Sequence, residues 1–141
     1  MSDRKHSKRV LIIDRQKGWR DEASQALSEK GFYVGVLDHY DYSPAEAMIA
    51  GEPPDLVILG CPGIGREERE LIHRVFEYKQ HLLVLSTSLR WADMRALFLA
   101  GADDVMDKPY ESTRLMDIVN QVFDNISSRS SYEQVSKEGA L

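Results

Sequence analysis

Side chains that could hold an ion or take part in a reaction follow several short apolar segments of this chain. They are a carboxylate, a hydroxyl and an amine: Asp14, Ser86 and Lys108. In parallel sheets, ligands and reactive groups gather at the carboxyl ends of the central strands, so we expect these side chains to line one pocket. The most central apolar segment, residues 56–59, ends at Gly60, which contributes no side chain where a reactive group is expected.

The apolar segments alternate with stretches that have helical signals. Short apolar runs bounded by turn residues are typical of strands buried on both faces of a parallel sheet. The predicted strands are residues 10–13, 32–37, 56–59, 82–85 and 104–106. Apolar periodicity and capping signals predict helices over residues 18–30, 44–51, 66–78, 91–100 and 112–126. Five alternating strand–helix units favour an α/β fold with right-handed crossovers.

Composition restricts the classes of function. The chain has 141 residues, of which 43% are hydrophobic and 29% charged, and this suits one globular domain. Its formal net charge of -5 gives no general attraction to nucleic acid or to an anionic membrane. No run is long enough to span a membrane, no signal peptide fits the N-terminus, and there is one cysteine. A cytoplasmic location is therefore predicted.

Three regions are expected along the chain. Residues 1–8 are basic and predict a flexible, solvated N-terminus. Residues 9–127 contain all the predicted strands and helices and form the domain. Residues 128–141 are rich in polar and charged side chains, which predicts a tail or a linker.

Three motifs together resemble the receiver domain of bacterial response regulators. They are PDLVIL at residues 54–59, GADD at residues 101–104 and KPY at residues 108–110. The resemblance covers about residues 8–127. It implies a flavodoxin-like (βα)5 fold, a doubly wound parallel sheet with strand order 2-1-3-4-5.

The resemblance also implies a phosphorylation pocket, and this chain departs from that pattern. Asp14 matches the first of two acids that help to hold Mg²⁺, but Arg15 replaces the second. Gly60 replaces the aspartate that accepts phosphate, whereas Ser86 and Lys108 match the residues that contact the phosphoryl oxygens. An acyl phosphate needs a carboxylate, and Mg²⁺ prefers carboxylate ligands. The sequence therefore predicts a degenerate pocket.

Several interpretations of this pocket remain open. Lys108 is predicted to form an ion pair with Asp14 across the vacated space. Arg15 either supplies a permanent positive charge where the metal would lie or simply faces solvent. Cys61 is either a small apolar side chain of the core or a redox-sensitive thiol. The four histidines have no metal-like spacing, so neither a metal nor a cofactor is predicted.

A second surface is expected at the helix over residues 91–100, which is apolar around more than one face. Part of that apolar surface should remain exposed, as at protein interfaces. By the resemblance, this helix forms a contact face with the fifth strand and the last helix. The residues assigned to this face are Trp91, Arg95, Leu99, Asp104, Val105 and Tyr110.

Three functions follow from these observations. The sequence favours a signalling module that contacts a protein partner or a second copy of itself without being phosphorylated. The first alternative is the N-terminal regulatory domain of a longer transcription regulator. The second is a small phosphatase with Cys61 as nucleophile and Arg66 in a phosphate loop, although four residues separate them where five are typical.

Overall fold

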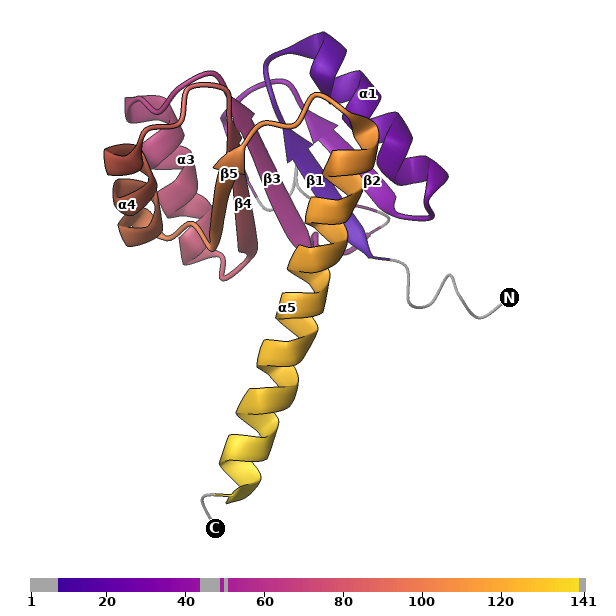
Figure 1. Cartoon of the computed structure of the whole chain (residues 1–141), viewed down its shortest axis with the longest axis vertical. Helices are drawn as coiled ribbons and strands as arrows, with labels where there is room; N and C mark the ends of the chain where they lie inside the picture. Colours follow the sequence, from indigo (N-terminus) through magenta and orange to yellow (C-terminus); the bar gives the residue numbers. More distant parts are fainter. Residues whose placement is uncertain (1–7, 44–48, 50, 140–141) are drawn as a thin grey trace.

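Five parallel strands form a single sheet in the order β2-β1-β3-β4-β5 (Figure 1). The computed structural model describes residues 8–43, 49 and 51–139, with side chains up to residue 128. The strands are β1 (Arg9–Ile13), β2 (Tyr33–Leu37), β3 (Leu56–Cys61), β4 (His81–Ser86) and β5 (Asp104–Asp107). The predicted flavodoxin-like α/β fold and its strand order are confirmed.

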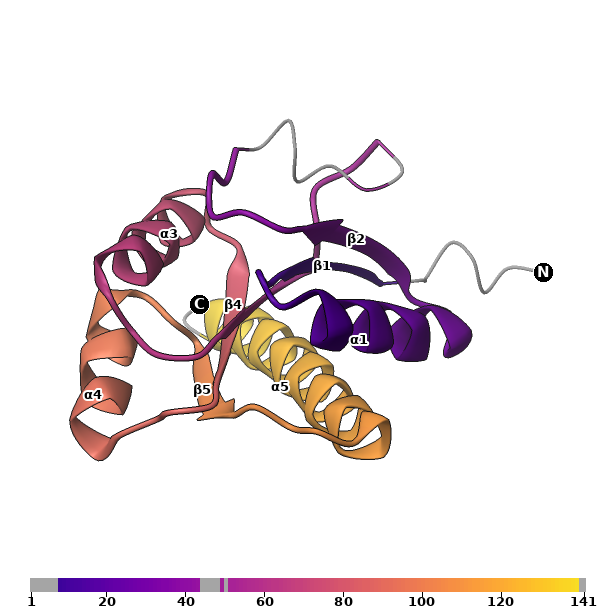
Figure 2. The ribbon, with the colours of Figure 1, turned by 90° about the horizontal axis from the view of Figure 1, so that it is seen from above.

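Helices cover both faces of the sheet (Figure 2). The helices are α1 (Lys17–Glu29), α3 (Arg66–Glu77), α4 (Trp91–Ala100) and α5 (Ser112–Gly139). One core layer lies between the sheet and α1 with α5, and the other lies under α3 and α4. Successive strand residues point to opposite faces, so Val10 and Ile12 join the first layer while Leu11 and Ile13 join the second.

β3 is the centre of this arrangement. All six of its residues are buried, and it pairs with β1 on one side and with β4 on the other. A strand enclosed on both faces needs apolar residues at every position, which explains the continuous run at residues 56–59. Its carboxyl end therefore opens at the middle of the sheet edge, between the ends of β1 and β4.

The last helix is longer than the sequence predicts. We expected it to end near residue 126, but α5 continues to Gly139 and extends beyond the sheet (Figure 1). Residues 127–138 contain neither glycine nor proline, so no residue interrupts the helical hydrogen bonding. Whether residues 128–141 serve as a linker stays a prediction.

The helix predicted over residues 44–51 lies mostly outside the described residues. Of that segment, the structure describes Ile49 and Gly51, and Ile49 forms an isolated antiparallel bridge with Glu52. No helix of the described part of the chain is long and apolar enough to cross a membrane.

Candidate functional site

The carboxyl edge of the sheet brings the predicted pocket residues together. Asp14 follows β1, Ser86 ends β4, and Lys108 follows β5; their exposed fractions are 2%, 0% and 5%. The amide of Lys108 donates to the carbonyl oxygen of Ser86 at 2.9 Å, which joins the ends of β4 and β5. Polar side chains are rarely buried unless they are paired, so their partners define what the pocket can do.

A buried ion pair lies in the pocket. Lys108 Nζ lies 2.8 Å from Asp14 Oδ2, and both side chains are 2% exposed. Lys108 Nζ also donates to Gln16 Oε1 at 2.9 Å, and the Gln16 amide donates to Asp14 Oδ1 at 2.7 Å. Oδ1 therefore accepts a hydrogen bond, whereas Oδ2 has the ammonium as its ion-pair partner and accepts no hydrogen bond from the described part of the chain. The predicted Asp14–Lys108 ion pair is confirmed.

Gly60 allows the Asp14 carboxylate to occupy this position. A Cβ atom on residue 60 would overlap Asp14 Oδ2 and would lie 3.0 Å from Asp14 Cγ. It would also lie 3.4 Å from Cζ3 of Trp19. The space that a side chain on residue 60 would need is thus filled by Asp14. Gly60 is required here for close approach rather than for an unusual backbone angle.

Two further pocket residues, Gln16 and Trp19, were not predicted as part of the site. The Trp19 indole Nε1–H donates to the Pro109 carbonyl at 2.8 Å, and Lys108 Nζ lies 4.6 Å from a Trp19 ring centroid. The sequence places Trp19 on the inner face of a helix, but it does not indicate a contact with Pro109, 90 residues away. The one available signal was the large side chain of Trp19, because the next residues on the same helical face are alanines.

Arg15 does not replace a metal ion beside Asp14. Its guanidinium forms an ion pair with Glu67 of α3 and lies 3.9 Å from the ring centroid of Tyr40. The hydrogen bond to Glu67 is the main cause that raises the pKa of Arg15. The side chain is 54% exposed. Of the two interpretations, the solvent-facing arginine agrees with the structure, and its ion pair connects the end of β1 to α3.

Mg²⁺, which the resemblance implies for such a pocket, does not fit these residues. Mg²⁺ needs several free oxygen ligands, but Asp14 Oδ1 accepts a hydrogen bond from the Gln16 amide and the Lys108 ammonium lies 2.8 Å from Oδ2. Glu68 lines the same hollow, and its Oε1 accepts a hydrogen bond from the Gly65 amide at 3.0 Å. Across the described residues, no three His, Cys, Asp or Glu side chains form a metal-binding group.

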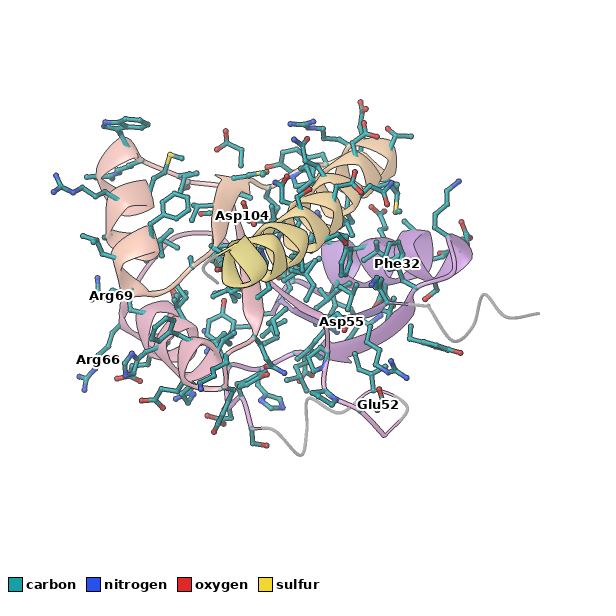
Figure 3. The ribbon with its side chains drawn as sticks, turned by 90° about the horizontal axis from the view of Figure 1, so that it is seen from below. Phe32, Glu52, Asp55, Arg66, Arg69 and Asp104 are labelled. Carbon is teal, nitrogen blue, oxygen red and sulfur yellow. The ribbon has the colours of Figure 1, made fainter. Side chains whose placement is uncertain are left out.

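Cys61 has the properties of a core residue rather than of a reactive thiol. It is fully buried, and burial raises the pKa of its thiol to about 12. A nucleophilic or redox-active cysteine needs a lowered pKa and access to solvent. Arg66, 87% exposed, pairs with Glu70 and points away from the sheet (Figure 3). These features argue against the phosphatase loop and favour the apolar interpretation of Cys61.

Several residues of the predicted contact face are exposed. Trp91, Leu99 and Tyr110 are 86%, 79% and 79% exposed, and Arg95 is also exposed. A mostly apolar hollow on α4 is lined by Trp91, Ala92, Met94, Arg95 and Phe98. α4 therefore presents more apolar surface to solvent than a helix that only covers a sheet.

Two assigned residues do not belong to an open contact face. Val105 is 5% exposed and lies in the core under α3 and α4, so it offers no open surface, and its role in a contact stays a prediction. The alternation of side chains along β5 turns it toward the face of the sheet that α3 and α4 cover. Asp104, labelled in Figure 3, is half-buried, and its Oδ2 lies 2.8 Å from Nε2 of His81. Its carboxylate is therefore engaged within the domain.

No family model matches the chain, but solved receiver domains share its fold. A CheY-like response regulator receiver domain from Methanospirillum hungatei JF-1 is 19% identical, with a TM-score of 0.74 over 87% of this chain and 98% of that one. A response regulator from Burkholderia multivorans is 24% identical, with a TM-score of 0.65 over 82% of this chain and 94% of that one.

A third similar structure is a longer protein, NtrX from Brucella abortus. It is 18% identical with a TM-score of 0.74, and the match covers 92% of this chain but 29% of NtrX. Because the sequence identities are low, these similarities show a shared fold and no more. This chain has the fold of response regulator receiver domains.

Proposed function

We propose that this chain is a receiver-type signalling module that acts through protein contact and does not depend on phosphorylation of its pocket. One observation carries the proposal: the Asp14 carboxylate fills the space above Gly60 and is held there by Lys108. A phosphoryl group would need both an acceptor side chain and room at this position. Neither is available while the ion pair is formed.

The charges around the pocket support the same conclusion. The charge of Asp14 is paired with that of Lys108, Gln16 hydrogen-bonds to both residues, and Arg15 is paired with Glu67. A pocket whose charged groups are paired internally has little free charge to attract an anion or a cation. Such a pocket keeps the surrounding loops in one conformation, and a module with one conformation presents a constant surface to its partner.

The first test of this proposal is phosphate transfer from a small donor. The protein is incubated with acetyl phosphate and Mg²⁺, and its intact mass is recorded before and after. We expect no mass increase, because residue 60 offers no carboxylate. A receiver that has the complete set of acids, treated in the same tube, serves as positive control. A stable phosphate adduct on this chain would contradict the proposal and would require another acceptor residue.

The contact surface is proposed to be α4 with the neighbouring Tyr110, and the partner to be another protein or a second copy. The exposed Trp91, Leu99 and Tyr110 supply apolar surface, while Arg95 supplies a charge at its edge. Aromatic and arginine side chains are enriched among the residues that dominate binding energy at protein interfaces.

A charge placed on this surface should weaken the contact. We expect Leu99→Glu to weaken self-association, or binding of an isolated partner, by about tenfold or more, because it buries a carboxylate in an apolar interface. Val36→Glu is the matched control, since Val36 is also exposed (46%) but lies on β2 at the other edge of the sheet. Sedimentation velocity measures the effect, and equal affinities for the two variants would exclude α4 as the contact surface.

A second candidate is the same module acting as the regulatory domain of a longer transcription regulator. The likeness to NtrX favours it, because this chain corresponds to 29% of that protein. The described part of this acidic chain contains no element suited to reading DNA, so a separate domain would have to bind DNA. The full-length coding sequence of the source gene tests this candidate directly.

A further inference from the structure

Trp19 connects three parts of the molecule that are distant in sequence. Its side chain is 9% exposed, and Cζ3 lies 3.4 Å from the Cβ position of residue 60 at the end of β3. The ring also lies beneath the Lys108 ammonium, 4.6 Å from Nζ, which is close enough for a cation–π interaction. Its Nε1–H donates to the carbonyl of Pro109 at 2.8 Å.

The turn at residues 108–111 depends on these contacts for its position. Pro109 has no amide hydrogen, so it can take part in a backbone hydrogen bond only through its carbonyl oxygen. Tyr110 is 79% exposed and supplies little packing. Two backbone bonds hold the ends of the turn: the Lys108 amide donates to Ser86, and the Leu115 amide of α5 donates to the Glu111 carbonyl. The side-chain contacts of the turn lead into the pocket, from Lys108 to Asp14 and Gln16 and from Pro109 to Trp19.

We infer that Trp19 is a built-in latch that fixes the turn at residues 108–111, and with it Tyr110, in one conformation. The indole occupies the pocket permanently and holds the Pro109 carbonyl and the Lys108 ammonium at the same time. A hydrogen bond and a ring contact from one rigid side chain restrict both translation and rotation of the turn. α1 therefore controls the position of Tyr110 without any bound ligand. This latch exists whether or not the chain meets a partner.

Hydrogen exchange of backbone amides tests the latch. Trp19→Phe keeps an aromatic ring but removes the indole N–H. In the full chain, we expect the Lys108 amide of this variant to exchange at least about tenfold faster relative to the Ile58 amide of β3, which reports global opening. The amide signals of Tyr110 and Glu111 should shift as well. Trp91→Phe, at an exposed site, is the control and should change neither. An unchanged Lys108-to-Ile58 ratio in Trp19→Phe would overturn the inference.

A second measurement uses the unmodified protein, so it does not depend on the folding of a variant. The indole N–H of Trp19 should exchange with solvent at least about 100-fold more slowly than that of Trp91, because a persistent bond to Pro109 protects it. Equal exchange rates for the two indoles would show that the bond does not persist, and the latch would then be excluded.

Discussion

Replacing Lys108 by methionine is expected to lower the free energy of unfolding by about 3–5 kcal/mol. Asp14 is 2% exposed, and its Oδ2 has Lys108 Nζ as its partner at 2.8 Å. Removing the ammonium leaves a carboxylate with an uncompensated charge in a site where water cannot solvate it. Urea denaturation followed by circular dichroism measures this effect.

Two comparisons separate the charge effect from a simple loss of packing. The double variant Asp14→Asn with Lys108→Met should regain most of the lost stability, because neither partner then leaves a buried charge. Lys17→Met removes an exposed ion pair, Lys17 Nζ to Asp21 Oδ2 at 2.7 Å, and should cost at most about 0.5 kcal/mol. If Lys108→Met costs no more than Lys17→Met, the ion pair does not hold the pocket closed.

Gly60→Ala is expected to destabilise the protein by about 1–3 kcal/mol, although alanine is normally no worse than glycine in a strand. The added Cβ would overlap Asp14 Oδ2, so Asp14 must leave its position beside Lys108. Thermal or urea unfolding measures the loss.

The penalty of Gly60→Ala should depend on Asp14. In an Asp14→Ala background the overlapping carboxylate is absent, and most of the penalty should disappear. Gly18→Ala is the control: this glycine lies in α1 with no atom within 4 Å of the added Cβ, so alanine should stabilise the helix by about 0.5–1 kcal/mol. If Gly18→Ala and Gly60→Ala change the free energy of unfolding by the same amount, the close approach of Asp14 to Gly60 is contradicted.

The strands were predictable because most of them are short apolar runs with a clear end, whereas the order of the strands in the sheet came from the resemblance to receiver domains. Burial on both faces requires such runs, and no other element type of this length explains residues 56–59. The Asp14–Lys108 pair was predictable too, since strand ends converge at one edge and opposite charges there must neutralise each other. Each of the five strands begins and ends within two residues of its predicted range.

Other features depend on tertiary contacts that the sequence pattern does not contain. The sequence left the position of Arg15 open, and its partner Glu67 lies on a helix 52 residues away. From the sequence, Trp19 is an ordinary core residue of α1. Its indole hydrogen bond to Pro109 depends on the position of the turn at residues 108–111, which the sequence pattern does not give. Val105 was assigned to the contact face from the resemblance, but it is buried, because its side chain lies on the face of the sheet that α3 and α4 cover.

The central claim is that the pocket is closed by its own side chains, and a titration with Mg²⁺ and beryllofluoride, a phosphoryl mimic, tests it most directly. The ¹H–¹⁵N spectrum of the whole chain is recorded as the two are added, first Mg²⁺ alone and then both. The account predicts no saturable shift at the amides of Asp14, Ser86 and Lys108, because the Asp14 carboxylate stays bound to Lys108. Saturable shifts at these amides would mean that the pocket opens and accepts the ligand, and would contradict the account.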